Sequence, residues 1–238
     1  MRSVFLIFFL LLVLFNFSAD AQFLPKKHGP KDTSNVPRKT QFLLMLGINK
    51  SQLKLKNANW DQGVIDYRDS LSGIFSSRKT GLELGLGLQF NVNPAFAVRP
   101  LLYLSFQEEM LSYFKVAGQQ DIKKTPVLAH LSIPVLYKVK LGERIWTYVG
   151  AGPALSIRAN PDEEENNPNN LPLKSAYVSA NFIAGVDIHP KKFGFYLSPE
   201  FRVSNGLTSI QKNASNLYSN VLTSVKRQIW SFSLTFKH

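Results

Sequence analysis

The segment 81–106 constrains the fold most, because it alternates between two faces over almost its whole length. Its first part, GLELGLGLQF, places a large apolar residue at every even position and Gly, Glu or Gln at every odd position. Residues 91–94 (NVNP) have the composition of a turn, and AFAVRPLLYLSF then resumes the alternation. Successive side chains of a β-strand point to opposite faces, so this segment predicts a β-hairpin with one apolar and one small or polar face.

The turn also predicts a register for this hairpin. If Phe90 lies opposite Phe96, then Gly87 falls opposite Arg99 and Glu83 falls opposite Tyr103. We therefore expect the two charged residues to pair with other strands and not with each other.

The same alternation returns along the rest of the chain, and no segment has a convincing helical period. Eight segments show it: 42–48, 82–90, 96–106, 129–139, 145–156, 177–188, 193–203 and 230–237. The connections 91–94, 141–144 and 189–192 are short, whereas 49–79, 107–125, 159–174 and 205–227 are long and polar. Strict alternation of short and long connections places all short turns and both strand termini at one end of a closed sheet, as in transmembrane barrels.

Three features indicate that the apolar face points outward, into lipid. The apolar face of each strand is long enough for a segment of ~9–11 residues to span a bilayer. The opposite face is rich in Gly, Ser, Ala and Asn, which suits the narrow interior of a small barrel. Aromatic residues lie at both ends of the strands, as in interfacial girdles. The prediction is an all-β fold, an eight-stranded antiparallel up-and-down transmembrane β-barrel, over residues 40–238.

The N-terminal residues predict export. Residues 1–21 combine an early Arg2, an apolar run and the small-x-small motif Ala19-Asp20-Ala21, which is typical of a cleaved signal peptide. Residues 22–39 are rich in Pro, Lys and polar residues without periodicity, and we expect a flexible basic periplasmic tail. The chain has no cysteine and therefore no disulfide or thiolate metal site. The expected location is the outer membrane of a Gram-negative bacterium.

The net charge of +12 does not indicate a nucleic-acid partner, because the lysines and arginines are spread over the tail, loops and turns. An exported protein without a basic helix or zinc finger rarely meets DNA. The charge is better explained by contact with anionic lipid headgroups or by a solvated surface. The expected partners are outer-membrane lipid and lipopolysaccharide, together with other envelope or secretion proteins.

Three segments resemble the PorT-like family of outer-membrane β-barrels of Bacteroidetes. They are NPAFAVRPLLYLSF, HLSIPVLYKVKLGERIWTYVGAGPALSI and FGFYLSPEFRVS. The resemblance covers most of residues 40–238 as a pattern of strands and carries no invariant catalytic motif. It implies a non-enzymatic envelope protein with an interaction or accessory role and a link to type IX protein secretion.

Six charged residues occupy polar-face positions and are predicted to point into the barrel. They are Glu83, Arg99, Lys138, Asp187, Glu200 and Arg202. An isolated charge inside a narrow barrel would cost several kcal/mol, so these residues are expected to form ion pairs. A salt-bridged plug is the preferred interpretation, and a gate or ion path is the alternative.

Two other function classes remain open at this point. His130 and Ser132 have the His-x-Ser spacing of outer-membrane lipid A deacylases, in which the His would act as base for a Ser nucleophile. The next carboxylate, Glu143, lies more than ~30 Å away along the chain at ~3.3 Å per residue, so it does not orient the histidine. The third class is a soluble periplasmic lipid carrier, whose apolar face would point inward.

Two long loops carry apolar residues that are candidates for partner docking or for covering the barrel mouth. These residues are Trp60, Tyr67, Phe75, Tyr113 and Phe114. The acidic run 162–165 (DEEE) lacks the ligand spacing of a calcium loop, and a solvated turn is the simpler interpretation. No cofactor, metal or catalytic residue is therefore predicted.

Overall fold

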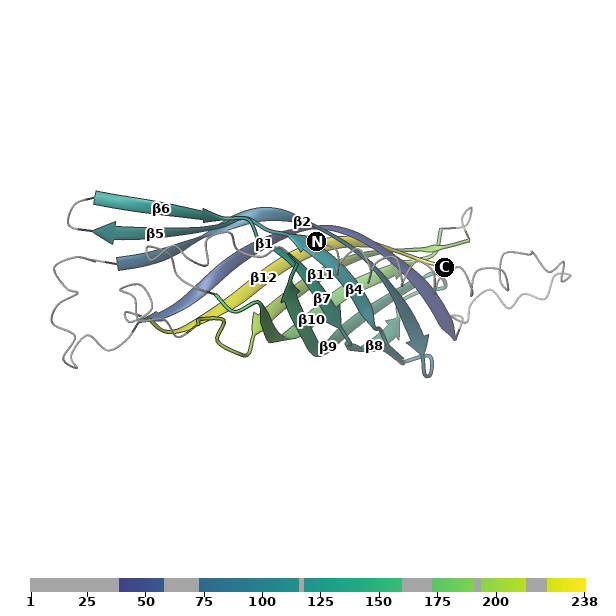
Figure 1. Ribbon diagram of the computed structural model, residues 1–238. Coiled ribbons are helices and arrows are strands. Elements are labelled where there is room, and N and C mark those ends of the chain that lie inside the picture. Colours follow the sequence, from purple (N-terminus) through teal and green to yellow (C-terminus); the bar gives the residue numbers. More distant parts are fainter. Residues whose placement is uncertain (1–38, 58–72, 116–117, 160–172, 191–193, 213–221) are drawn as a thin grey trace, which may run out of the picture. The chain divides into compact units, whose positions relative to one another are not determined.

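The computed structural model describes residues 39–57, 73–115, 118–159, 173–190, 194–212 and 222–238, all within the compact unit Pro37–His238. These residues form twelve β-strands (Figure 1). The strands are β1 Thr40–Asn57, β2 Gly73–Asn91, β3 Phe96–Val98, β4 Leu101–Phe106, β5 Glu109–Lys115, β6 Gly118–Lys124, β7 Val127–Ser132, β8 Val135–Lys140, β9 Ile145–Arg158, β10 Ala176–Ile188, β11 Tyr196–Gly206 and β12 Leu222–Lys237. Among the described residues, no helix is long and apolar enough to cross a membrane.

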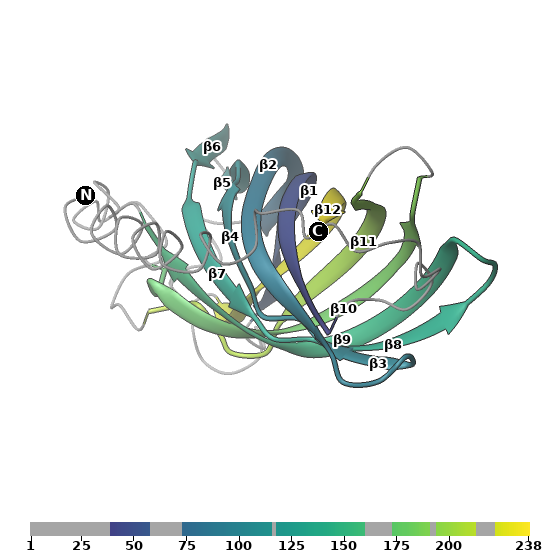
Figure 2. The same cartoon turned by 90° about the vertical axis from the view of Figure 1, so that its right-hand side faces the viewer.

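The antiparallel pairings return to their starting point and so close the sheet into a barrel. β1 pairs with β2 on one side and with β12 on the other, and β9, β10, β11 and β12 follow one another. Between β2 and β9, the short strands β3 and β8 pair at one level, and β4 and β7 pair at another (Figure 2). β3 with β4, and β7 with β8, each form one interrupted wall strand. The ring therefore has the eight antiparallel wall strands that the alternation predicted.

Burial confirms that the apolar face points outward. The large apolar side chains that remain exposed include Leu44, Leu84, Val149, Phe182 and Phe232. Buried polar or charged side chains alternate with several of them along the strands, such as Glu83 beside Leu84, Asn181 beside Phe182 and Ser231 beside Phe232. Both ends of the ring lie at the short-turn end, where the backbone amides of Phe42 and His238 donate to each other's carbonyl oxygens at 3.0 Å.

The register of the first hairpin differs from the prediction. Phe90 pairs with Val98, Gly87 with Leu101 and Glu83 with Ser105. The turn is longer than expected, since the amides of Val92 and Asn93 both donate to the carbonyl oxygen of Phe96. This shifts every partner by two residues and leaves the side-chain faces unchanged, which is why the orientation was right although the register was wrong.

Two wall strands are each interrupted at a residue followed by proline, and the two interruptions lie next to each other in the wall. Arg99-Pro100 separates β3 from β4, and Ile133-Pro134 separates β7 from β8. The amide of Arg99 donates to the carbonyl oxygen of Pro134 at 3.0 Å, which joins the two irregular sites. Proline has no backbone N–H to donate to the ladder, so the backbone hydrogen bonds at this place come from neighbouring residues such as Arg99. The seventh strand also begins later than expected, at Tyr196, and residues 191–193 lie outside the described part of the chain.

The predicted long connections 49–79 and 107–125 contain regular strands, which corrects the view that they are simple loops. β1 continues to Asn57 and β2 already begins at Gly73, while 109–124 holds the hairpin β5–β6. This hairpin pairs with the first residues of β2, outside the ring (Figure 1). Beyond Ser51, β1 no longer pairs with β2, so the wall divides here into a β1–β12 arm and a β2–β5–β6 arm.

The two faces of β1 exchange their polarity where the wall divides. Up to Ile48 the outward side chains are apolar, but Lys50, Lys54 and Lys56 follow on the same exposed face. On the inward face, Asn49 and Ser51 give way to Leu53, which is buried. A search for outward apolar alternation ends at this exchange, which explains why the strand was predicted to stop near residue 48.

An inward glycine in β2 makes room for a tyrosine on the neighbouring strand. Gly85 pairs with Tyr103, and a Cβ added to Gly85 would lie 2.5 Å from Tyr103 Cβ and 2.9 Å from the carbonyl oxygen of Leu102. Such contacts are too short, so the substitution requires the wall itself to shift. At Gly142, by contrast, an added Cβ meets no atom within 4 Å.

We expect Gly85→Ala to lower the free energy of unfolding by about 1–3 kcal/mol, the usual cost of overpacking. Gly142→Ala is the matched control and is expected to stay within about 0.5 kcal/mol of the parent. Urea unfolding in detergent micelles, followed by tryptophan fluorescence, measures both. Equal midpoints for the two variants would contradict the close packing of Tyr103 on Gly85.

Candidate functional site

The interior of the barrel carries the predicted charge cluster, and all six of its residues are buried there. The most buried carboxylate of its central layer is Glu200 on β11, which is 1% exposed. Arg99, from the interruption between β3 and β4, forms an ion pair with Glu200 Oε2. Tyr148 on β9 donates its hydroxyl to the same oxygen at 2.9 Å, and Arg202 Nη2 lies 3.1 Å from Oε1. The central layer thus holds one carboxylate between two guanidinium groups.

Arg202 extends this layer to a second carboxylate. Its Nη2 lies 3.7 Å from Glu83 Oε1 on β2, and the hydroxyl of Ser231 donates to Glu83 Oε2 at 3.0 Å. No ion pair joins Glu83 to Arg99 among the described residues, as the sequence predicted. A carboxylate that is removed from water needs such donors, because burial without them costs several kcal/mol.

A second layer lies closer to the short turns and is centred on Asp187 of β10. Lys237 Nζ and the hydroxyl of Ser198 both donate to Asp187 Oδ1 at 2.6 Å. Lys138 Nζ is 3.9 Å from Asp187 Oδ2. Gln89 connects the two layers, since its Oε1 accepts from Lys237 at 3.3 Å and from Arg99 Nη2 at 2.9 Å.

Lys237 was absent from the predicted cluster, although it forms the shorter of the two ion pairs with Asp187. The sequence placed it on the polar face of the last strand, directly after the outward Phe236. The position of Lys237 in the alternation was therefore enough to predict that its side chain points into the barrel. Its partner could not be identified, because Asp187 lies fifty residues away on a strand two places along the ring.

The two guanidinium groups of the central layer each lie against the ring of a tyrosine. Arg99 Cζ lies 4.7 Å from the ring centroid of Tyr148, and Arg202 Cζ lies 4.6 Å from that of Tyr103. A Cβ at Gly185, which pairs with Tyr148, would clash with the tyrosine hydroxyl. A glycine opposite a tyrosine therefore occurs twice in the wall. In both cases it leaves room for the tyrosine ring, whose face contacts a guanidinium group.

A further ion pair, outside the two layers, lies toward the loop end of the barrel, near the division of the wall. Arg227 Nε and Nη2 donate to the two oxygens of Glu109 at 2.7 and 3.0 Å, and Ser51 donates to Oε1 at 2.9 Å. Burial alone would raise the pKa of the Glu109 carboxyl, but Arg227 and Ser51 outweigh it and the pKa is lowered. The sequence missed this pair, because both residues fell in predicted loops.

Apolar side chains close the interior next to this ion pair. The cluster contains Leu53, Leu111, Leu128, Leu173, Tyr177, Ile210, Leu222 and Val225. These residues come from β1, β5, β7, β10 and β12 and from two connecting segments. The described part of the interior therefore contains two charged layers, a further ion pair and this apolar cluster, the apolar cap.

His130 and Ser132 do not form the dyad of the deacylase hypothesis. His130 Nδ1 is hydrogen-bonded to Ser156 Oγ at 2.7 Å, and its ring stacks on Tyr103 with centroids 4.5 Å apart. Ser132 Oγ instead accepts a hydrogen bond from Asn181 Nδ2 at 2.8 Å. Both residues are at most 1% exposed inside the barrel.

The predicted docking residues are only partly covered by the structure. Phe75 on β2 is 63% exposed, in the arm that extends beyond the ring. Tyr113 and Phe114 belong to β5, whose last side chains are outside the described part. Trp60, Tyr67 and the acidic run 162–165 also lie outside the described residues. No group of three or more potential metal ligands occurs within the described ranges.

The central layer predicts a large cost for loss of its carboxylate. Glu200→Gln leaves two buried guanidinium groups without their shared counter-charge, and we expect it to reduce the free energy of unfolding by about 3–5 kcal/mol. Glu108→Gln is the control, because the Glu108–Lys123 pair is partly exposed to solvent and is expected to contribute at most about 1 kcal/mol. Urea titration of the folded barrel in micelles measures both, and equal losses would contradict a buried network centred on Glu200.

Comparison with known proteins agrees with this architecture. No family model matches the sequence, and no curated protein matches it. The outer-membrane protein OprG from Pseudomonas aeruginosa has 12% sequence identity and a TM-score of 0.50, with 86% of this chain and 98% of that chain covered. AlkL, determined in lipid bilayers, has 12% identity and a TM-score of 0.48 over 88% and 93% of the two chains. Neisserial surface protein A has 11% identity and a TM-score of 0.45 over 82% and 95%. The chain has the fold of the outer-membrane β-barrels.

Proposed function

We propose that this chain is an integral outer-membrane protein with a non-enzymatic interaction or accessory role in the cell envelope. The observation that carries the proposal is the reversal of the usual soluble arrangement. Apolar side chains such as Leu46, Val149 and Phe232 are about half exposed on the outside, while Glu200, Arg99 and Arg202 are buried inside. In water the exposed belt would be costly, whereas in lipid it is the favourable surface.

The dimensions of the wall support membrane insertion. β10 has 13 residues, and its outward face is apolar from Val178 to Ile188. A tilted strand of ~9–11 residues spans a bilayer. Phe90 and Phe96 at the turn end, and Phe106, Phe201 and Trp230 at the other, occupy the places of two aromatic girdles.

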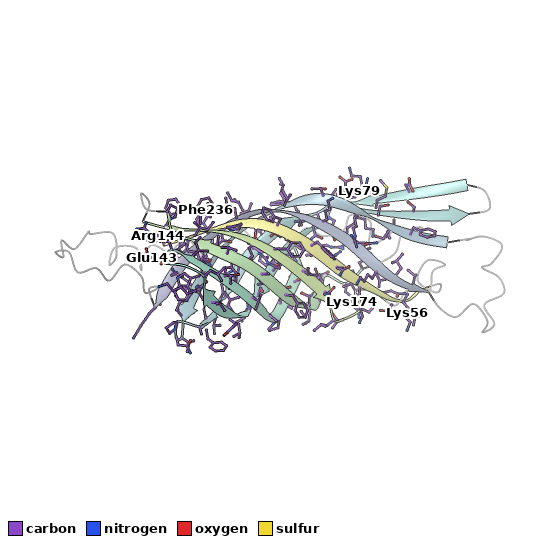
Figure 3. The ribbon with its side chains drawn as sticks, turned by 180° about the vertical axis from the view of Figure 1, so that it is seen from behind. Lys56, Lys79, Glu143, Arg144, Lys174 and Phe236 are labelled. Atoms are coloured by element: carbon purple, nitrogen blue, oxygen red, sulfur yellow. The ribbon has the colours of Figure 1, made fainter. Side chains whose placement is uncertain are left out.

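The orientation follows from the two unequal ends. Short turns are typical of the periplasmic side, and the long strand extensions and loops of the external side. Lys56, Lys79 and Lys174 lie toward the loop end, and Phe236, Glu143 and Arg144 lie at the turn end (Figure 3). In this orientation Thr40, the first residue of β1, lies on the periplasmic side of the outer membrane. The predicted signal peptide 1–21 and nearly all of the predicted basic tail 22–39 lie outside the described residues.

The content of the described interior supports an interaction role. The described interior is filled by ion pairs and closed by the apolar cap, so the surfaces left for function are the extended strands and loops. The charged interior also does not suit a soluble lipid carrier, which needs an apolar cavity. The resemblance to the PorT-like barrels of Bacteroidetes supports a link to type IX protein secretion. Co-purification of envelope proteins in mild detergent identifies the partner.

Membrane insertion is tested by fractionation of cells that express the full chain. We expect the protein in the outer-membrane fraction, soluble only with detergent, and faster migration of the unheated sample on a denaturing gel. The unheated barrel is compact because its wall closes on itself. Recovery in the soluble periplasmic fraction without detergent would contradict the proposal and favour the lipid carrier.

The absence of an enzymatic role is tested at the one serine that the sequence singled out. We expect Ser132→Ala to leave the fatty-acid composition of lipopolysaccharide unchanged, because Ser132 is 1% exposed inside the barrel. Mass spectrometry of lipid A from wild-type, variant and deletion strains measures this. Fatty acid released by the wild type and lost in the variant would establish the deacylase instead.

A further inference from the structure

A group of exposed cations lies on one side of the wall, directly above the apolar belt. This basic patch spans β1, β2 and β12 and consists of Lys50, Lys54, Lys56, Arg78 and Lys226. Lys50 pairs with Trp230, the last outward aromatic residue of β12 before the loop end. The basic patch therefore begins where the apolar belt ends, and the two surfaces adjoin.

The cations of the basic patch are close together. Lys54 and Lys226 are direct partners in the antiparallel ladder of β1 and β12, and both are exposed. Directly opposite residues have Cβ atoms about 4.5–5.5 Å apart, and like charges in that position repel each other. Lys56 follows on the same face, two residues along β1. A bound anion would relieve this repulsion.

Arg78 is held in a fixed position at the lower border of the basic patch. Its Nε donates to Gln52 Oε1 at 2.7 Å, and its Cζ lies 5.4 Å from the ring centroid of Trp230. The guanidinium is thus placed over an indole that belongs to the proposed girdle. Arginine in such a place presents its remaining donors toward the headgroup level.

The described carboxylates do not neutralise the basic patch. Glu83, Glu109, Asp187 and Glu200 are buried in the interior, and Glu108 pairs with Lys123 at 3.1 Å. Glu143 lies at the opposite end of the barrel (Figure 3). No ion pair joins any cation of the basic patch to a carboxylate within the part of the chain that the structure describes.

The height of the basic patch matches the position of lipid phosphates. Lys54 lies four residues beyond Lys50, which is about 13 Å along the strand and about 9 Å along the membrane normal for a strand tilted by ~45°. The polar headgroup layer on each side of a bilayer is about 5–8 Å thick. The backbone of Lys50 therefore lies at the inner border of the headgroup layer and that of Lys54 just beyond its outer border. The long, flexible side chains of Lys54 and Lys226 can extend back from there to the phosphates.

We propose that the basic patch is a binding site for the phosphate groups of lipopolysaccharide, the phosphorylated lipid of the external leaflet, with its acyl chains lying on the adjoining apolar belt. This proposal rests on the proposed function, because it requires the loop end to face that leaflet. Any lipid can make the apolar contact with the belt. The contact of phosphate groups with Lys54, Lys56 and Lys226 distinguishes lipopolysaccharide from lipids that lack them.

The test uses the full mature barrel, first shown by its gel shift to be folded in neutral detergent. Binding of bisphosphorylated lipid A is measured by native mass spectrometry. We expect the triple variant Lys54→Gln, Lys56→Gln and Lys226→Gln to bind at least about tenfold more weakly, because each lysine near an anionic surface contributes favourably. The matched control, Lys39→Gln, Lys140→Gln and Arg144→Gln, removes three cations from the turn end and is expected to bind as the parent does.

Two further arms identify the chemistry of the ligand. Dephosphorylated lipid A should bind the parent as weakly as the triple variant binds the phosphorylated form, with no further loss when both changes are combined. The variant Lys54→Arg with Lys226→Arg should keep binding, since it retains the charge. Excess inorganic phosphate should not displace lipid A, and displacement would overturn the assignment to a lipid.

Equal binding by the parent and the triple variant would overturn the proposal, and so would equal binding of lipid A with and without phosphate. An acidic protein as the true occupant of the basic patch would give this result. A barrel that fails to enter membranes at all contradicts the proposed function itself. A barrel that inserts but does not distinguish phosphorylated lipid contradicts only the lipid site.

Discussion

The structure depends on one constraint, which is that a charge inside a narrow barrel must find its counter-charge within the wall that encloses it. Glu200 meets this constraint between Arg99 and Arg202, and Asp187 meets it between Lys138 and Lys237. Glu200 and Arg202 both lie on β11, but the other partners come from different strands, so those ion pairs fix the distance between distant parts of the wall. An apolar filling would satisfy the same volume with less directional specificity.

The sequence was sufficient for the direction of nearly every wall side chain and insufficient for the contacts between them. Alternation has a period of two, so Leu84 and Glu83 could be assigned to opposite faces without knowledge of the register. The register itself depends on the conformation of one turn, and there the prediction was wrong by two residues. Pairings across the ring, such as Lys237 with Asp187, depend on the stagger of eight strands and leave no local pattern.

The largest error of the prediction, the early end of the first strand, arises because the surroundings of the strand change along its length. The prediction searched for outward apolar and inward polar residues, and this rule holds only at the height of the proposed bilayer. Beyond Ile48, β1 keeps its alternation but exchanges its faces, with Leu53 inward and Lys54 outward. That is the ordinary pattern of a soluble sheet, so a single strand passes from one solvent regime to the other without any change in backbone.

The closing strand gives the interior a dependence on the order of assembly. β12 pairs with β1 across the join between the two ends of the barrel. Before this join forms, Glu83 on β2 lacks both the Ser231 hydroxyl of β12, 3.0 Å away, and the Arg202 guanidinium of β11, 3.7 Å away. Ring closure and neutralisation of Glu83 are therefore one event. A partly closed barrel would be penalised electrostatically as well as by its open edges, which makes closure cooperative.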